Sequence, residues 1–181
     1  MESFEHRRER FSGNPDEFMS TLIISISNFF IPELCKAKES GLEDLLILGI
    51  HSVVETLSEN IFRKKGLAGV RFYLENFVDG KEDGFKFSEI AKELNAWRNI
   101  IAHQFLSKLG HFLVSDSTLK VGFKKDGDRI FFNPNLYFDY FESAFSSSPK
   151  SLRSIYDYRD LMSQADMMNT KEKFLKKFKD R

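Results

Sequence analysis

A long apolar run near the start of the chain sets the first requirement on the fold. Residues 42–64, LEDLLILGIHSVVETLSENIFRK, continue without a helix breaker until Gly66. Ser40, followed three positions later by Glu43, matches a capping box, which marks the start of a helix. A helix this apolar has to be covered by other elements. We therefore expect residues 42–64 to form the longest and most buried helix of the domain.

Three further helices are predicted before residue 110. Asn14 and Pro15 favour a helix start, and Pro32 is expected to end that helix after about four turns. Another apolar stretch, AGVRFYLENFV, stops at the loop DGKEDG. Ser88 can then cap a fourth helix, which carries ELNAWRNIIAHQFLSKLG at 93–110. The first two thirds of the chain therefore indicate four consecutive helices.

After residue 110 the apolar period changes from helical to alternating. Alternation over 119–123 and the Asp126-Gly127 pair predict a β-hairpin within about 111–133. Asn133-Pro134 and Ser148-Pro149 each favour a new helix start, the second helix running to about residue 166. The expected fold class is mainly all-α: an up-and-down bundle of about five to six helices with a small β-hairpin insertion.

The length and the charge of the chain limit the possible domain organisation and the possible binding partners. With 181 residues we expect one helical domain at 14–165, a charged segment at 1–13 and a basic tail at 166–181. The 27 basic residues equal the 27 acidic ones, so any nucleic-acid contact must come from a local patch. Twenty phenylalanines are more than a core needs, which favours a subunit contact.

Cysteine usage and the N-terminal segment point to a reducing compartment. Cys35 is the one cysteine, which excludes an internal disulfide and a cysteine-based zinc site. The segment MESFEHRRERF is charged where an export signal would be apolar. The apolar runs are shorter than the roughly 20 residues that cross a bilayer. We expect a cytoplasmic protein without membrane contact.

Two charged patterns outside the 93–110 helix have competing interpretations. His51, Glu55 and Glu59 step by four, which suits a metal site but is more often a solvated stripe, so no metal and no cofactor are expected. The tail KEKFLKKFKDR is either a docking helix with a solvated lysine face or a surface for RNA or a membrane. The lysines proposed to bind RNA are Lys92, Lys173, Lys176 and Lys177.

The predicted helix at 93–110 has its apolar and polar side chains on different sides. At about 100° per residue, one sector holds the apolar residues Ile90, Leu94, Trp97, Ile101 and Phe105. Asn99 and His103 form an i, i+4 pair on the opposite side, near Lys92. Arg98 lies at the border, where burial of a guanidinium is costly unless a partner or an anion meets it.

The stretch RNIIAH, residues 98–103, resembles the R-N-x-x-x-H form of the R-x(4–6)-H motif of the HEPN superfamily. These are small helical-bundle proteins with the motif on a late core helix, so the resemblance extends to the helix order over about 14–165. It implies that Arg98 and His103 serve a metal-independent ribonuclease and that Asn99 supports the site. It also implies a symmetric homodimer whose two motifs face one cleft.

The chemistry of these residues agrees with that role. Histidine, with an ordinary pKa near 6.5, can move protons at neutral pH, and arginine stays charged beside a phosphorane. We expect RNA cleavage by the 2′-OH, in a toxin or phage-defence setting with an antitoxin or other regulatory partner. One HEPN toxin group has a tyrosine, which a partner nucleotidyltransferase modifies, where this chain has Phe105.

Two other functions stay open at the level of the sequence. HEPN-like domains also serve as non-catalytic interaction or nucleotide-binding modules, and the balanced charge suits that role. A metal enzyme using His51, Glu55 and Glu59 is the weaker alternative.

Overall fold

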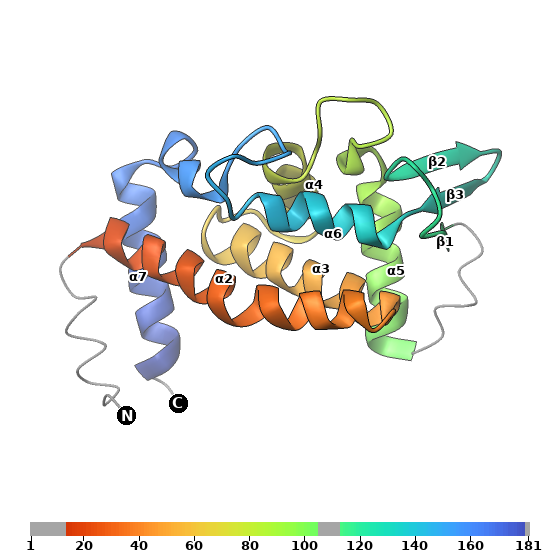
Figure 1. Cartoon of the computed structure of the whole chain (residues 1–181). Coiled ribbons are helices and arrows are strands. Elements are labelled where there is room, and N and C mark those ends of the chain that lie inside the picture. Colours follow the sequence, from red (N-terminus) through yellow and green to blue (C-terminus); the bar gives the residue numbers. More distant parts are fainter. Residues whose placement is uncertain (1–13, 105–112, 180–181) are drawn as a thin grey trace.

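A computed structural model describes residues 14–104 and 113–179 of the chain. These residues form a mainly helical bundle with a small three-stranded sheet, so the predicted fold class is confirmed (Figure 1). The helices are α2 (Pro15–Glu39), α3 (Glu43–Asn60), α4 (Gly66–Phe77), α5 (Ala91–Gln104), α6 (Pro134–Ser143) and α7 (Gln164–Lys179), with 3-10 turns η1 (Phe87–Ile90) and η3 (Ile155–Asp160). The strands are β1 (Leu113–Ser115), β2 (Phe123–Asp126) and β3 (Arg129–Phe132).

Helix α2 begins where predicted but does not end at Pro32. The side chain of Asn14 accepts a hydrogen bond from the Asp16 amide at 3.0 Å, which caps the helix. The helix continues through Pro32 to Glu39. Proline removes one intrahelical hydrogen bond, and the carbonyl it frees lies in the exposed stretch 28–30, where water can hydrate it. The prediction that Pro32 ends this helix was therefore wrong.

The greater length of α2 bears on membrane contact. Over the described residues, α2 alone is long and apolar enough to cross a bilayer, a test that core helices of globular proteins also pass. Helix α2 packs on α3 and α7, and 33% of its apolar window is buried. The helix is longer than the sequence indicated, so the prediction that this run is too short to cross a bilayer was wrong by length.

Helix α3 is shorter than predicted and has a different start. It begins at Glu43 with no side-chain cap, because Ser40 serves instead as the C-cap of α2, with its amide donating to the Lys36 carbonyl at 3.0 Å. It ends at Asn60, and the chain then turns through Arg63, which has a left-handed φ of 58°. The predicted capping box and the helix end at residue 64 were both wrong. The prediction that this is the longest helix was wrong too, because α2 has 25 residues and α3 has 18.

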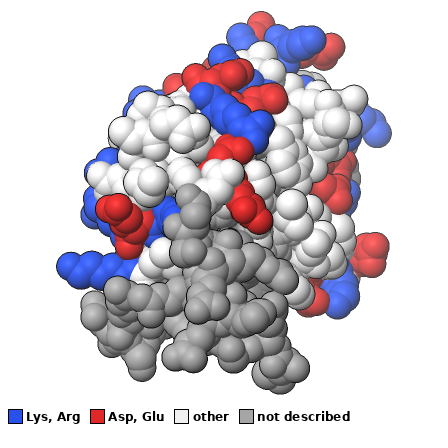
Figure 2. Space-filling model, turned by 90° about the vertical axis from the view of Figure 1, so that its left-hand side faces the viewer, with Lys and Arg blue, Asp and Glu red and all other residues white. Residues whose placement is uncertain are grey.

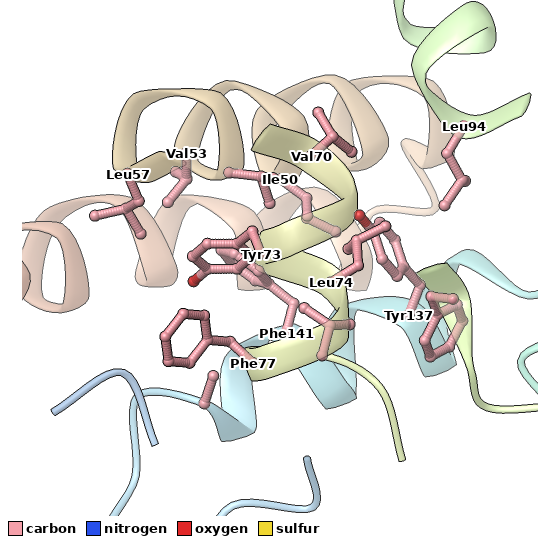
Figure 3. Close-up of a cluster of buried hydrophobic side chains, with 14 of the residues drawn as sticks. Ile50, Val53, Leu57, Val70, Tyr73, Leu74, Phe77, Leu94, Tyr137 and Phe141 are labelled. Carbon is pink, nitrogen blue, oxygen red and sulfur yellow. The ribbon is translucent and has the colours of Figure 1, made fainter. Parts of the chain in front are cut away.

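The core lies around α3, as its apolar sequence predicted. Figure 3 shows α3 and α4 facing each other through apolar side chains, joined by α5 and α6. These residues are Ile50, Val53 and Leu57 of α3, Val70, Tyr73, Leu74 and Phe77 of α4, Leu94 of α5, and Tyr137 and Phe141 of α6. Each fully buried aliphatic or aromatic side chain contributes roughly 1.5–3 kcal/mol relative to its exposed state. This packing fixes the position of α5 against α3.

The sheet contains the predicted hairpin, but its first strand is Phe123–Asp126 and not the alternating stretch 119–123, and one further strand was not predicted. Strands β2 and β3 pair antiparallel around Gly127, which has a φ of 56°. Strand β1 pairs in parallel with β3, giving the order β1-β3-β2. Phe87 joins the sheet to the bundle, because its ring contacts Phe132 and Tyr137. A Cβ atom at Gly122 would lie 2.4 Å from Phe87 Cζ, so this approach requires glycine.

The C-terminal third differs from the prediction in one element. Helix α6 starts at Pro134 as expected, with Asn133 accepting from the amides of Asn135 and Leu136. The helix predicted from Ser148-Pro149 to about residue 166 does not form; a loop leads into the short turn η3 instead. Ser154 fixes this loop, because its hydroxyl lies within hydrogen-bond distance of the carbonyls of Ala144 and Ser146. The basic tail forms α7, which packs on α2.

The start of the segment that carries the motif is held by Asp79, a residue that precedes this segment in the chain. Ser88 was predicted to cap it, but Ser88 lies inside η1 and itself donates to Asp79 at the end of α4. Its amide donates to one carboxylate oxygen at 2.9 Å and its hydroxyl donates to the other. Asp79 is 5% exposed, and burial raises its pKa to about 6. The start of the motif helix therefore depends on a buried carboxylate.

Candidate functional site

The motif helix α5 presents the predicted apolar stripe to the core. Leu94, Trp97 and Ile101 are all buried, and Trp97 packs its ring edge-on against Phe132 of the sheet. Phe105, which was assigned to the same stripe, lies outside the described residues. The stripe holds α5 with one face against α3 and α4. Its orientation follows from the period of the sequence, as expected.

Arg98 emerges at the edge of this stripe and is held by two acceptors. Its Nη1 donates to Asn99 Oδ1 at 2.8 Å, and its Nη2 donates to the Glu55 carboxylate of α3, with which it forms an ion pair. The Arg98 side chain is 23% exposed and that of Glu55 is 28% exposed. The partner that Arg98 was predicted to need is therefore present within the chain, 43 positions away.

The two other motif residues are placed to different extents. Asn99 is half-buried and orients the guanidinium of Arg98 through its side-chain oxygen. The backbone of His103 lies in the last turn of α5, and its side chain lies outside the described residues. Arg98 and Asn99 thus form one hydrogen-bonded unit, five and four positions before the histidine on the same helix.

The side chains of His51, Glu55 and Glu59 lie in three different environments. His51 is fully buried, with Nε2 lying 3.3 Å from the Tyr137 hydroxyl. Burial, and then the positive charge of Arg98, lower the pKa of His51 to about 3, so this imidazole is neutral. Glu55 pairs with Arg98, whereas Glu59 pairs with Lys65 at 3.4 Å. No group of three metal-ligating side chains occurs in the described ranges.

His51 lies one helical turn before Glu55 on α3, and the positive charge of Arg98 contributes to lowering its pKa. Its neutral state avoids a second positive charge near the guanidinium. The Nε of Arg98 is buried and has no acceptor among the residues that the structure describes. The Nε edge of the guanidinium is thus enclosed.

The lysines proposed to bind RNA do not gather around Arg98 in one copy of the chain. Lys92 is exposed in the first turn of α5. Lys173 and Lys176 are exposed on α7, which lies at the opposite end of the bundle (Figure 1). The side chain of Lys177 lies outside the described residues. A single site that uses all four lysines is therefore not formed within one copy.

The surface at the α7 end carries both signs of charge. Figure 2 shows Lys and Arg side chains directly beside Asp and Glu side chains on this face. Two pairs account for part of the mixture: Arg63 with Asp166 at 3.7 Å, and Arg159 with Asp16, whose pKa the guanidinium lowers to about 2. Such a surface gives no uniform attraction to a polyanion.

Two surface pockets lie away from the motif. One, of about 310 Å³, is lined by Cys35, Lys38 and Glu142 between α2 and α6, and burial raises the pKa of the Cys35 thiol, which makes it a weak nucleophile. The other, of about 420 Å³, lies at the turn after α3 beside Arg63 and Asp166. Neither is lined by Arg98.

Sequence reasoning missed Glu55 as a partner of the motif arginine. In the sequence, Glu55 belongs to the possible metal site formed with His51 and Glu59, and no local sequence pattern links it to Arg98. Its position on the face of α3 that meets α5 was the available signal, together with the requirement of Arg98 for a counter-charge.

Comparisons of this chain with protein-family models, curated proteins and solved structures found no match.

Proposed function

We propose that this protein is a HEPN-like, metal-independent endoribonuclease that acts as a homodimer. The observation that carries the proposal is the fixed guanidinium of Arg98, which Asn99 of the same helix and Glu55 of α3 hold by hydrogen bonds. Arg98 lies on α5, the helix that also bears His103. Each Nη nitrogen carries two hydrogens, and the bonds to Asn99 and Glu55 engage one on each. The remaining hydrogens suit the oxygens of a phosphate.

The reaction is an in-line attack of a ribose 2′-OH on the adjacent phosphate. His103 removes the proton of the 2′-OH as the bond from that oxygen to phosphorus forms. The bond to the 5′-oxygen breaks, and this oxygen receives a proton from a second imidazole that starts in its protonated, cationic form and ends neutral. Arg98 stabilises the negative charge on the phosphorane oxygens between these events. The products are a 2′,3′-cyclic phosphate and a 5′-hydroxyl.

A twofold arrangement supplies the second proton carrier. One neutral imidazole cannot accept and donate protons at two oxygens in the same step, so His103 of the other copy takes the second role. In a symmetric dimer the same surface of each copy meets itself, which brings equivalent residues near the axis. We propose that the face of α5 bearing Asn99 and His103 lines the shared cleft.

The second candidate is a non-catalytic interaction or nucleotide-binding module. The ion pair of Arg98 with Glu55 favours it, because the charge of the arginine is already balanced inside the chain. The mixed charge of the α7 end also suits a protein partner better than a nucleic acid.

Incubation with RNA in excess EDTA separates the two functions. The ribonuclease is expected to cleave a mixed-sequence RNA at the same rate with and without chelator, and to leave DNA of the same sequence intact because DNA lacks the 2′-OH. Arg98→Ala is the inactive control. Arg71→Ala, which removes an exposed arginine of α4, is the matched variant expected to keep full activity. Intact RNA after incubation with the wild-type protein would favour the interaction module.

A further inference from the structure

Glu55 of α3 contacts the proposed site through its hydrogen bond with Arg98. It approaches Arg98 from a different helix and accepts a hydrogen bond from Nη2, while Asn99 accepts from Nη1. Two acceptors on two terminal nitrogens define the plane of a guanidinium, which one acceptor does not. The rotation of the Arg98 side chain is thus restricted by contacts from both α3 and α5.

We propose that Glu55 is a positioning residue that fixes the Arg98 guanidinium for a phosphate, an inference that rests on the proposed ribonuclease function. Glu55 touches no reacting atom in this scheme. It acts through Arg98, by holding the free Nη hydrogens in one orientation before substrate arrives. A preset donor lowers the barrier more than one that must be ordered during the reaction.

The burial of the pair favours positioning over a competing role as a latch. A latch would hold Arg98 until phosphate displaced Glu55, leaving the carboxylate without its cation. Glu55 is 28% exposed, so losing its partner in this partly buried place is costly. The neutral, buried His51 one turn earlier offers no alternative positive charge. The carboxylate is therefore expected to stay on Arg98 when phosphate binds.

Two substitutions at Glu55 separate its hydrogen bond from its charge. Glu55→Gln keeps an oxygen acceptor for Nη2, whereas Glu55→Ala removes it. The matched control is Glu59→Ala, one turn later on α3, where the carboxylate pairs with Lys65 at the surface. We expect kcat of Glu55→Gln within about threefold of wild type, and kcat of Glu55→Ala reduced at least about tenfold with little change in KM. Glu59→Ala should match wild type.

A second readout works without enzymatic activity. Nitrogen-15 NMR of the arginine side chains reports how freely each guanidinium rotates, with the Arg98 signal assigned from its absence in Arg98→Lys. We expect restricted rotation in wild type and Glu55→Gln, and free rotation in Glu55→Ala. This arm distinguishes failure of the proposed function from failure of the positioning role: wild-type protein that cleaves no RNA removes the ribonuclease, and the NMR result then decides about Glu55.

Several results would overturn the positioning role. Faster cleavage by either Glu55 variant would identify a latch. Equal loss in Glu55→Gln and Glu55→Ala, or unchanged activity in Glu55→Ala, would show that the hydrogen bond does not matter. Free rotation of the Arg98 guanidinium in wild type, or rotation unchanged in Glu55→Ala, would contradict the proposal without reference to catalysis.

Discussion

Replacing His103 with alanine is expected to lower the rate of RNA cleavage by about 10²- to 10⁴-fold, the usual contribution of a general acid-base residue. In the proposed dimer each active site uses two copies of His103, one as base and one as acid. The substitution removes both carriers at once, so the loss should lie toward the upper part of this range. The measurement is single-turnover cleavage of a labelled RNA in excess EDTA.

The control for this prediction is His6→Ala, which removes a histidine of the N-terminal segment and should leave the cleavage rate unchanged. Circular dichroism should show that His103→Ala keeps the helical content of the wild type. Mixing wild-type and His103→Ala subunits gives a further test, because a mixed dimer retains one imidazole and should cleave much more slowly than a wild-type dimer. Undiminished cleavage by folded His103→Ala would remove this residue from the mechanism.

Replacing Asp79 with asparagine is expected to stabilise the protein at neutral pH. Burial raises the pKa of Asp79 to about 6, with further increases from Glu75 and Glu89, against decreases from the Ser88 hydrogen bonds. The folded protein therefore retains a proton between about pH 4 and pH 6 that the unfolded chain releases. The contribution of Asp79 to stability is greatest below this window and is lost as the pH rises through it. A shift of roughly two pKa units corresponds to about 3 kcal/mol.

Asparagine keeps an oxygen acceptor for the Ser88 amide and carries no charge. Urea denaturation should thus show Asp79→Asn more stable than wild type by up to about 3 kcal/mol at pH 7.5, and nearly equal to it at pH 4. Ser88→Ala is the opposite variant, since it removes a donor that favours the charged carboxylate, and it should destabilise the protein at pH 7.5. Lower stability of Asp79→Asn at pH 7.5 would show that the charge of Asp79 is needed to start the motif segment.

Helix starts were predictable where the cap and the helix are adjacent in sequence and no other element competes. Asn14 and Asn133 both cap the helix that follows them, and each is followed by a proline that preorganises the first turn. Ser40 and Ser88 have equally good local patterns, yet one ends α2 and the other donates to Asp79. The local sequence pattern does not distinguish an N-cap from the roles that Ser40 and Ser88 take, so tertiary contacts determine the outcome.

Pairings between distant segments were the least predictable part. Strand β1 has three residues and no alternation long enough to detect, and its pairing with β3 depends on where the sheet meets the bundle. The site shows the same limit. The helical period correctly placed Arg98 at the border of the apolar stripe, whereas its partner Glu55 became evident only once α3 and α5 were packed together.

Cleavage by the 2′-OH without a metal leaves characteristic chemical groups at the ends of the products. The measurement is mass spectrometry of the fragments from a short RNA cleaved by wild-type protein in excess EDTA. We expect a 2′,3′-cyclic phosphate on one fragment and a 5′-hydroxyl on the other, with cleavage abolished when the nucleotide before the scissile phosphate is 2′-deoxy. Fragments with a 3′-hydroxyl and a 5′-phosphate, or RNA that stays intact, would contradict it.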